Sequence, residues 1–196
     1  MIILQIAMIV RQYLYRSIVI LIAAIAFCTM LLIQPSLLPA LDQTDESAPL
    51  LDSESSSKSV VHLYFSDKEN SFLTAEERVF INTELQADFG KMIIEALIEG
   101  SEKGLVRTIP AGTKLRAFYV TKEGIAFVDL TDKVKDAHPG GVQSELLTIF
   151  SIVDSLVLNM PQVEAVKILI NGNESMTLAG HVDLRFPLKA NMLLIR

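Results

Sequence analysis

One uninterrupted apolar run near the N-terminus constrains this chain more than any other feature. Residues 18–33 read IVILIAAIAFCTMLLI, in which Thr29 carries the only polar side chain. With the residues just before it, the run approaches the roughly 20 residues that a helix needs to cross a bilayer. Arg11 and Arg16 precede the run and acidic residues follow it, so the positive-inside rule predicts a cytoplasmic N-terminus. We therefore expect a cytoplasmic segment at 1–16, a transmembrane signal-anchor helix at 17–33, and the rest of the chain outside the cytoplasm.

A cleaved signal peptide and a lipid-modified cysteine are the alternatives to an anchor. The best cleavage site follows the sequence LPA at 38–40, which places leucine where a small side chain is required. For lipid modification, Phe27 stands before Cys28 where a small residue is expected, and the cysteine lies deep in the apolar run. The sequence favours a retained anchor over both. It leaves open whether translation starts at Met1 or at Met8.

A tether and one folded domain follow the apolar run. Residues 34–59 are rich in proline, serine and acidic side chains, with Lys58 the only base, so we expect a flexible linker. Residues 60–196 are long enough to build one sizeable core. Their charges of both signs are interspersed, which indicates no basic surface for nucleic acid. The only cysteine, Cys28, lies in the apolar run, so the folded domain has no internal disulfide.

The first strongly periodic segment of the domain indicates an amphipathic helix. Its apolar stripe consists of Leu85, Phe89, Met92, Ile93, Ala96 and Leu97. Thr83 and Gln86 have the spacing of a capping box, and Gly100 is placed to end the helix.

The remaining elements follow from alternation, turn residues and a second periodic segment. We expect strands at 60–66, 115–120, 125–130, 163–170 and 175–178, a further extended piece at 73–82, and a second helix at 142–160. Asn171-Gly172 is the expected tight turn before the last strand. The order β-α-β-β-α-β-β predicts an α+β domain in which two helices pack on one face of a single small mixed sheet.

The histidines and glycines indicate no cofactor or metal. His62, His138 and His181 have no metal-ligand spacing, and no cysteine accompanies them in the domain. The glycines fit neither of the two common phosphate-binding patterns and are better interpreted as turns and caps. We therefore expect neither a metal site nor a bound cofactor.

Catalytic side chains are equally hard to find. His181 and Asp183 could share one face of a strand, and Ser144 or Ser175 could in principle complete a triad. The G-x-S-x-G turn that exposes such a serine is missing, however. The neighbouring acidic residues at 76–77, and those at 129 and 132, are interpreted as solvated charges. The sequence therefore predicts a domain without enzymatic activity.

A set of short motifs runs in order along residues 60–187. They are VHLYFSD, LTAEERVF with Arg78, LIEG ending at Gly100, GLVRTIPAGTKL from Gly104, GIAFVDLT from Gly124, IVDSL in the second helix, ILING ending at Gly172, and LAGHVDLRFP from Leu178. In this combination the domain resembles the GerMN domain, a module of bacterial sporulation and germination proteins that also occurs in membrane-attached lipoproteins and in bacteria that do not sporulate. Two departures stand out. Ser101 replaces the usual proline, which predicts a looser loop, and only one copy is present, whereas the best-known member has two.

The resemblance implies an interaction or assembly module of the bacterial cell envelope, anchored in the inner (cytoplasmic) membrane. GerMN domains are similar to the ring-building domains of envelope-spanning machines. The implied partners are other envelope proteins or peptidoglycan, with self-assembly as a further route and no nucleic acid. An extracytoplasmic cell-wall hydrolase and a domain that senses a small ligand or lipid are the alternatives. The resemblance implies roles as fold determinants for Arg78, Gly100, Pro110, Gly112, Asp129, Gly172, Gly180 and His181.

Overall fold

The computed structural model describes residues 58–81, 83 and 85–196. The expected cytoplasmic segment at 1–16, the anchor at 17–33 and nearly all of the linker at 34–59 lie outside these residues. Within the described part of the chain, no helix is both long enough and apolar enough to span a bilayer.

The described chain begins with an antiparallel hairpin. Strand β1 (Lys58–Ser66) pairs with β2 (Leu73–Ile81), and the register places Val61 opposite Arg78. The extended piece expected at 73–82 is therefore a full strand. Val61, Leu63 and Phe65 of β1 are fully buried, because the face of the hairpin that they share packs on the helices.

A second, four-stranded sheet contains β3 (Leu115–Val120), β4 (Ile125–Leu130), β5 (Ala165–Ile170) and β6 (Asn173–Glu174), in that spatial order. The pairs β3–β4 and β5–β6 are antiparallel, whereas β4 and β5 are parallel because a helical crossover joins them. The sheet is therefore mixed, as expected.

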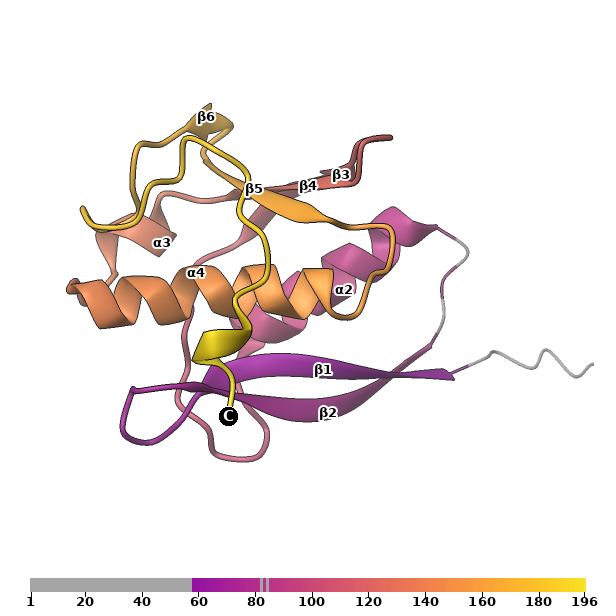
Figure 1. Ribbon diagram of the computed structural model, residues 1–196, viewed down its shortest axis with the longest axis horizontal. Helices are drawn as coiled ribbons and strands as arrows, with labels where there is room; N and C mark the ends of the chain where they lie inside the picture. The colour runs from indigo at the N-terminus through magenta and orange to yellow at the C-terminus, as the bar shows by residue number, and fades with distance from the viewer. Residues whose placement is uncertain (1–57, 82, 84) are drawn as a thin grey trace, which may run out of the picture. The chain divides into compact units, whose positions relative to one another are not determined.

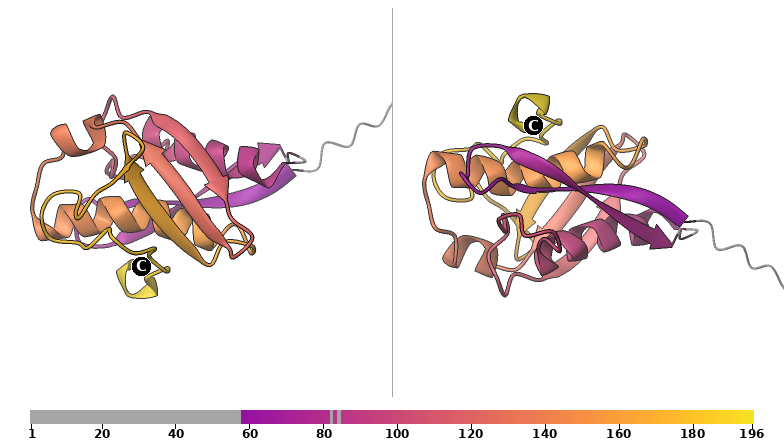
Figure 2. Two further views of the ribbon diagram at one scale, coloured as in Figure 1. Left: turned by 90° about the horizontal axis from the view of Figure 1, so that it is seen from above. Right: turned by 90° about the horizontal axis from the view of Figure 1, so that it is seen from below.

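Two long helices lie between these sheets (Figures 1 and 2). Helices α2 (Gln86–Glu99) and α4 (Val142–Val157) both contact β1 on one side, while α2 contacts β3 and α4 contacts β5 on the other. The chain also forms a short helix α3 (Lys133–Asp136) and a 3-10 turn η1 (Met192–Leu194). The buried apolar residues of all three layers make one core.

The expectation of a single sheet was wrong. The outer edge of β1 is bonded by side chains of the α4 segment instead of by another strand. The His62 amide donates to Asn159 Oδ1 at 2.9 Å, and the Tyr64 amide donates to Ser155 Oγ at 3.0 Å. Because these side chains bond the backbone amides at that edge, the hairpin does not pair with the second sheet. It forms a layer of its own, and the helices are covered on two faces.

The start of α2 also differs from the expectation. Leu85 is the N-cap and offers no side-chain cap, while the Thr83 hydroxyl donates to the Leu85 carbonyl, so there is no capping box. Leu85 is 65% exposed, and the buried face of the helix includes Gly90 instead. The Phe118 ring packs there: a Cβ at position 90 would lie 2.2 Å from it. Gly100 ends the helix as expected, with φ of +98°.

The turn at 171–172 is confirmed, but the strand after it is displaced. Asn171 and Gly172 have φ of +52° and +77°, and Ile170 pairs with Asn173 across them. The last strand is the short β6 at 173–174 rather than residues 175–178. The amide of Leu178 is bonded to a helix side chain instead of a strand, as described below.

Candidate functional site

Glu76 on β2 is fully buried and organises the loop after α2. Its carboxylate accepts hydrogen bonds from the Arg78 guanidinium at 2.8 Å, from the Ser101 hydroxyl at 2.5 Å, and from two backbone amides of the loop, Glu102 and Lys103, at 3.1 Å each. Arg78 also donates to the Gly100 carbonyl at 2.5 Å. The two side chains reach each other because residues i and i+2 share a face of a strand.

These contacts correct two expectations. The charge at 76 is not solvated: burial alone would raise the pKa of Glu76, but the bonds from Ser101, Glu102 and Arg78 lower it to about 2. Ser101 does not loosen the loop either. Its hydroxyl oxygen accepts from the amides of Lys103 and Leu105, at 3.1 and 2.9 Å, while its hydrogen goes to Glu76. Serine therefore fixes this turn through hydrogen bonds.

Asp129 on β4 holds the turn between β5 and β6 through a hydrogen bond. Its Oδ1 accepts from the Gly172 amide at 2.7 Å, and its Oδ2 lies 3.3 Å from Arg116 Nη1. The carboxylate is buried, whereas the one at 132 is exposed as expected. Two of the eight implied fold determinants, Asp129 and Gly172, are thus direct hydrogen-bond partners.

Glu145 in the first turn of α4 is the third buried carboxylate, and it holds the loop at 178–181. It accepts from the amides of Leu178, Ala179 and His181 at 3.0, 2.8 and 2.8 Å, and from His181 Nδ1 at 2.9 Å. Burial alone would raise the pKa of Glu145, yet the bonds from Ala179 and His181 lower it below its ordinary value.

The structure therefore pairs His181 with Glu145 and not with Asp183. The Asp183 carboxylate is exposed and binds the Arg185 guanidinium at 2.8 Å. Among the described residues, neither Ser144 nor Ser175 is hydrogen-bonded to His181; the Ser175 hydroxyl donates to the Thr177 carbonyl instead. The triad that the sequence allowed is not assembled in this structure.

Asp154 on α4 is the fourth buried carboxylate. Its Oδ1 accepts from the Asn191 amide at 2.9 Å, which fastens the C-terminal segment, while Oδ2 has no hydrogen-bond partner among the residues that the structure describes. Burial raises the pKa of Asp154 to about 6. The pKa of the nearby Tyr64 hydroxyl is raised by burial and by the charge of Asp154.

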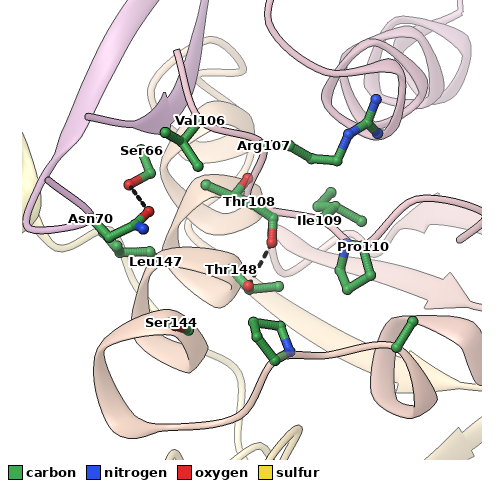
Figure 3. A pocket seen from close by; sticks show the side chains of 12 residues that line it. Ser66, Asn70, Val106, Arg107, Thr108, Ile109, Pro110, Ser144, Leu147 and Thr148 are labelled. Carbon is green, nitrogen blue, oxygen red and sulfur yellow. Dashed lines mark hydrogen bonds between the residues drawn. The ribbon is translucent and has the colours of Figure 1, made fainter. Parts of the chain in front are cut away.

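Pro110 lies in a cavity of about 170 Å³ enclosed by the loop at 106–110, the start of α4 and the end of β1 (Figure 3). Several of its polar groups are hydrogen-bonded to each other. Thr148 donates to the Thr108 carbonyl at 2.6 Å, and Ser66 donates to Asn70 Oδ1 at 2.9 Å. The cavity is thus a polar junction between three segments.

His138 borders this junction as a neutral imidazole. Its Nδ1 accepts from the Gly140 amide at 3.0 Å, so Nε2 carries the proton and faces Thr148 Oγ1 at 3.1 Å. Burial lowers the pKa of His138, which is consistent with the neutral form. His62, in contrast, lies on the exposed face of the hairpin, 3.5 Å from Glu77.

Gly112 and Gly180 have positive φ, at +84° and +105°. The amide of Gly180 donates to the Thr177 hydroxyl at 3.1 Å, inside the loop that Glu145 holds. No group of three histidine, cysteine or acidic side chains able to hold a metal occurs in the described ranges.

A groove of about 450 Å³ runs between β2 and α2, beside the Glu76 network. Its walls are Glu77, Arg78, Val79 and Phe80 on the strand, Met92, Glu95, Ala96 and Glu99 on the helix, and Glu102 in the loop. It is larger than the cavity at Pro110, and its four glutamates make the wall mainly acidic.

Sequence reasoning missed the burial of all four carboxylates, at 76, 129, 145 and 154, and interpreted those at 76 and 129 as solvated. One signal was available for α4: Leu147 and Ile152 lie outside its apolar face, which the sequence predicts at 146, 149, 150, 153, 156 and 157, and a helix that is apolar all round is buried. Charges inside such a helix must then be buried and bonded. For Glu76, the signal was an opposite charge two residues away in a strand.

Comparison with known proteins agrees with this architecture. The family described as Germane, sporulation and spore germination, matches residues 62–175. The tandem GerMN domains of the sporulation protein GerM from Bacillus subtilis are similar at TM-score 0.56 and 22% identity, over 68% of this chain and 46% of that one. The chain therefore spans about half of that structure.

The first GerMN domain of the same Bacillus subtilis protein is similar at TM-score 0.52 and 20% identity, over 67% of this chain and 97% of that one. No curated protein matches the sequence. At these identities the structures establish a shared fold, and the family match covers more than half of the chain. The chain belongs to the Germane family, and the described residues contain a GerMN domain.

Proposed function

We propose that this chain is a single-pass membrane protein whose GerMN domain is held outside the cytoplasm as an interaction module of the bacterial cell envelope. The apolar run at 18–33, with arginines before it and acidic residues after it, supports the anchor and its direction. The family supports the envelope setting.

The proposed interaction role is supported mainly by the way in which the buried carboxylates are hydrogen-bonded. Glu76, Asp129, Glu145 and Asp154 each accept from the backbone amides of a loop or terminal segment. Six of the eight residues implied by the family resemblance either take part in these networks or lie in the loops that they hold. These four buried carboxylates thus fix the shape of the domain. We therefore assign binding to its exposed surfaces.

A cell-wall hydrolase is the competing function, and His181 is the residue that would serve it. Three of the four hydrogen bonds to Glu145 come from backbone amides, which favours a loop anchor over a device for orienting a catalytic base. We expect His181→Ala to lower the melting temperature without changing any turnover. Digestion of purified cell wall by the wild-type protein, lost in this variant, would establish the hydrolase instead.

Protease treatment of protoplasts tests the anchor and its direction. We expect external protease to remove the domain from intact protoplasts, and an alkaline carbonate wash to leave the untreated protein in the membrane pellet. A domain that is degraded only after permeabilisation would refute the orientation. Release by the wash would refute the anchor.

A further inference from the structure

The two edges of the β1–β2 hairpin are treated differently by the fold. The outer edge of β1 is hydrogen-bonded from His62 to Ser66. In addition to the bonds that Asn159 and Ser155 make, the Ser66 amide donates to the Val106 carbonyl at 3.1 Å, and the Ser66 carbonyl accepts from the Val106 amide at 2.9 Å. An unpaired strand edge is a template for another chain, and the fold removes that template on this side.

The outer edge of β2 remains open beyond its first residue. Ile195 forms a parallel bridge with Leu73, whose carbonyl accepts from the Arg196 amide at 2.9 Å. In the described residues, no further backbone hydrogen bond reaches this edge. Because outward and inward groups alternate along a strand, the amides and carbonyls of Ala75, Glu77 and Val79 point the same way as those of Leu73.

The acidic groove follows this open edge. Four consecutive residues of β2, 77 to 80, line it, although successive side chains point to opposite faces of a sheet. A groove that touches all four must run beside the strand rather than over one face. The opposite wall consists of residues 92, 95, 96 and 99, which form one stripe along α2. A strand edge beside a helix is the geometry in which extended peptides bind by adding a strand.

The chemistry of the groove defines what can occupy it. Its apolar surface comes from Val79, which is 64% exposed, together with Phe80 and Met92. Four carboxylates line it: Glu77, Glu95, Glu99 and Glu102. The one cation in its wall, Arg78, binds the buried Glu76 at 2.8 Å and lies 3.5 Å from Glu102, so the other three carboxylates have no cation in the wall. An occupant with lysine or arginine at alternate positions would therefore match the charge of the groove.

We propose that this groove binds an extended, basic segment of a partner protein, which pairs with β2 as a third strand. Alternate side chains of the segment contact the carboxylates, and those between them contact Val79, Phe80 and Met92. This inference rests on the proposed interaction function and names its surface and the class of partner. Pairing with a second copy through the same edge is opposed by the repulsion between like carboxylates.

Fluorescence polarisation with the full chain in a neutral detergent tests the proposal. The probe is a labelled peptide that alternates lysine with valine, blocked at both ends. Two further peptides separate the contributions to binding. One replaces lysine by glutamate, and the other carries N-methyl groups on alternate amides, so that it keeps its charge but loses the donors on one edge.

Variants of the protein locate the site. Glu95→Lys/Glu99→Lys reverses two exposed charges on α2, and Glu123→Lys/Glu164→Lys makes the same change in net charge away from the groove. Val79→Pro removes an outward amide donor while leaving the β1 pairing intact, because proline is tolerated at a strand edge.

The proposal predicts saturable binding of the lysine peptide and at least tenfold weaker binding for Glu95→Lys/Glu99→Lys, for Val79→Pro and for the N-methylated peptide. If Val79→Pro fails to melt cooperatively, the N-methylated peptide alone decides the backbone contribution. No saturable binding, equal affinity for the N-methylated peptide, or equal losses in the two charge-reversed variants would each overturn the proposal. None of these results bears on the proposed membrane anchor, which the protease experiment tests separately.

Discussion

Replacing Glu76 by glutamine tests whether the buried carboxylates hold the loops of this domain. The change keeps the size of the side chain but removes its charge and turns one acceptor oxygen into a donor. Arg78 then keeps a buried charge, with 8% of its side chain exposed, and loses its counterion. The Ser101 hydroxyl and the Lys103 amide, which both donate to Glu76 Oε2, face a competing N–H group in one of the two amide orientations.

Two routes give the magnitude at neutral pH. Breaking a buried ion pair by removing one partner costs about 3–5 kcal/mol. The fall in the pKa of Glu76 from 4.5 to about 2 corresponds to about 3 kcal/mol, at roughly 1.4 kcal/mol per pKa unit. Because the folded pKa is depressed, this stabilisation is complete above pH 4.5 and is lost as the pH falls through about 2. The gap between wild type and variant should close over the same interval.

Urea denaturation followed by circular dichroism, in one detergent for all proteins, measures the free energy of unfolding. Glu77→Gln is the matched control, since this neighbouring side chain is 65% exposed and should stay within about 0.5 kcal/mol of wild type. Hydrogen exchange at the Glu102 and Lys103 amides reports on the loop itself. The reasoning fails if Glu76→Gln matches its control at pH 7, or if its deficit is the same at pH 3 as at pH 7.

Three further changes test other parts of the fold. Asp154→Asn should raise the free energy of unfolding at pH 8 by about 1–2 kcal/mol, because it removes a buried charge. Since the pKa of Asp154 is raised in the folded state, this gain should vanish as the pH falls from about 6 through 3.8, and a gain unchanged at pH 4 would contradict the reasoning. Gly90→Ala should destabilise the domain by about 1–2 kcal/mol, since overpacking against Phe118 outweighs the better helix propensity of alanine. In a protein that also carries Phe118→Leu, Gly90→Ala should have no such cost, and an equal cost there would contradict the overpacking. Gly172→Val should lower stability by about 1–3 kcal/mol at a φ of +77°, with Gly172→Asn tolerated much better, and equal melting temperatures would contradict the turn.

Local signals in the sequence predicted most elements of this fold but not their assembly. Periodicity located both long helices, and Asn171-Gly172 marked a turn that the structure contains. The number of sheets was out of reach, because it depends on which strand edges meet. The outer edge of β1 is satisfied by Ser155 and Asn159, about ninety residues away along the chain.

The sequence indicated some members of the candidate site but not their chemistry. The family resemblance singled out Arg78, Asp129 and His181, and each of them proved to be bonded in a loop-holding network. Their partners Glu76 and Glu145 were missed, since a carboxylate is solvated by default and burial becomes favourable only where several donors converge. That convergence comes from loops that are distant in sequence, so no local pattern reveals it.

Site-directed crosslinking on intact protoplasts tests most directly whether this domain binds a partner outside the cytoplasm. Glu99→Cys in the groove and Glu123→Cys in the β3–β4 turn would be labelled with a membrane-impermeant maleimide that carries benzophenone, and then irradiated. We predict that both positions are labelled without permeabilisation, and that only the position in the groove crosslinks to a second polypeptide. Labelling that requires permeabilisation, or identical crosslinks from both positions, would contradict the account.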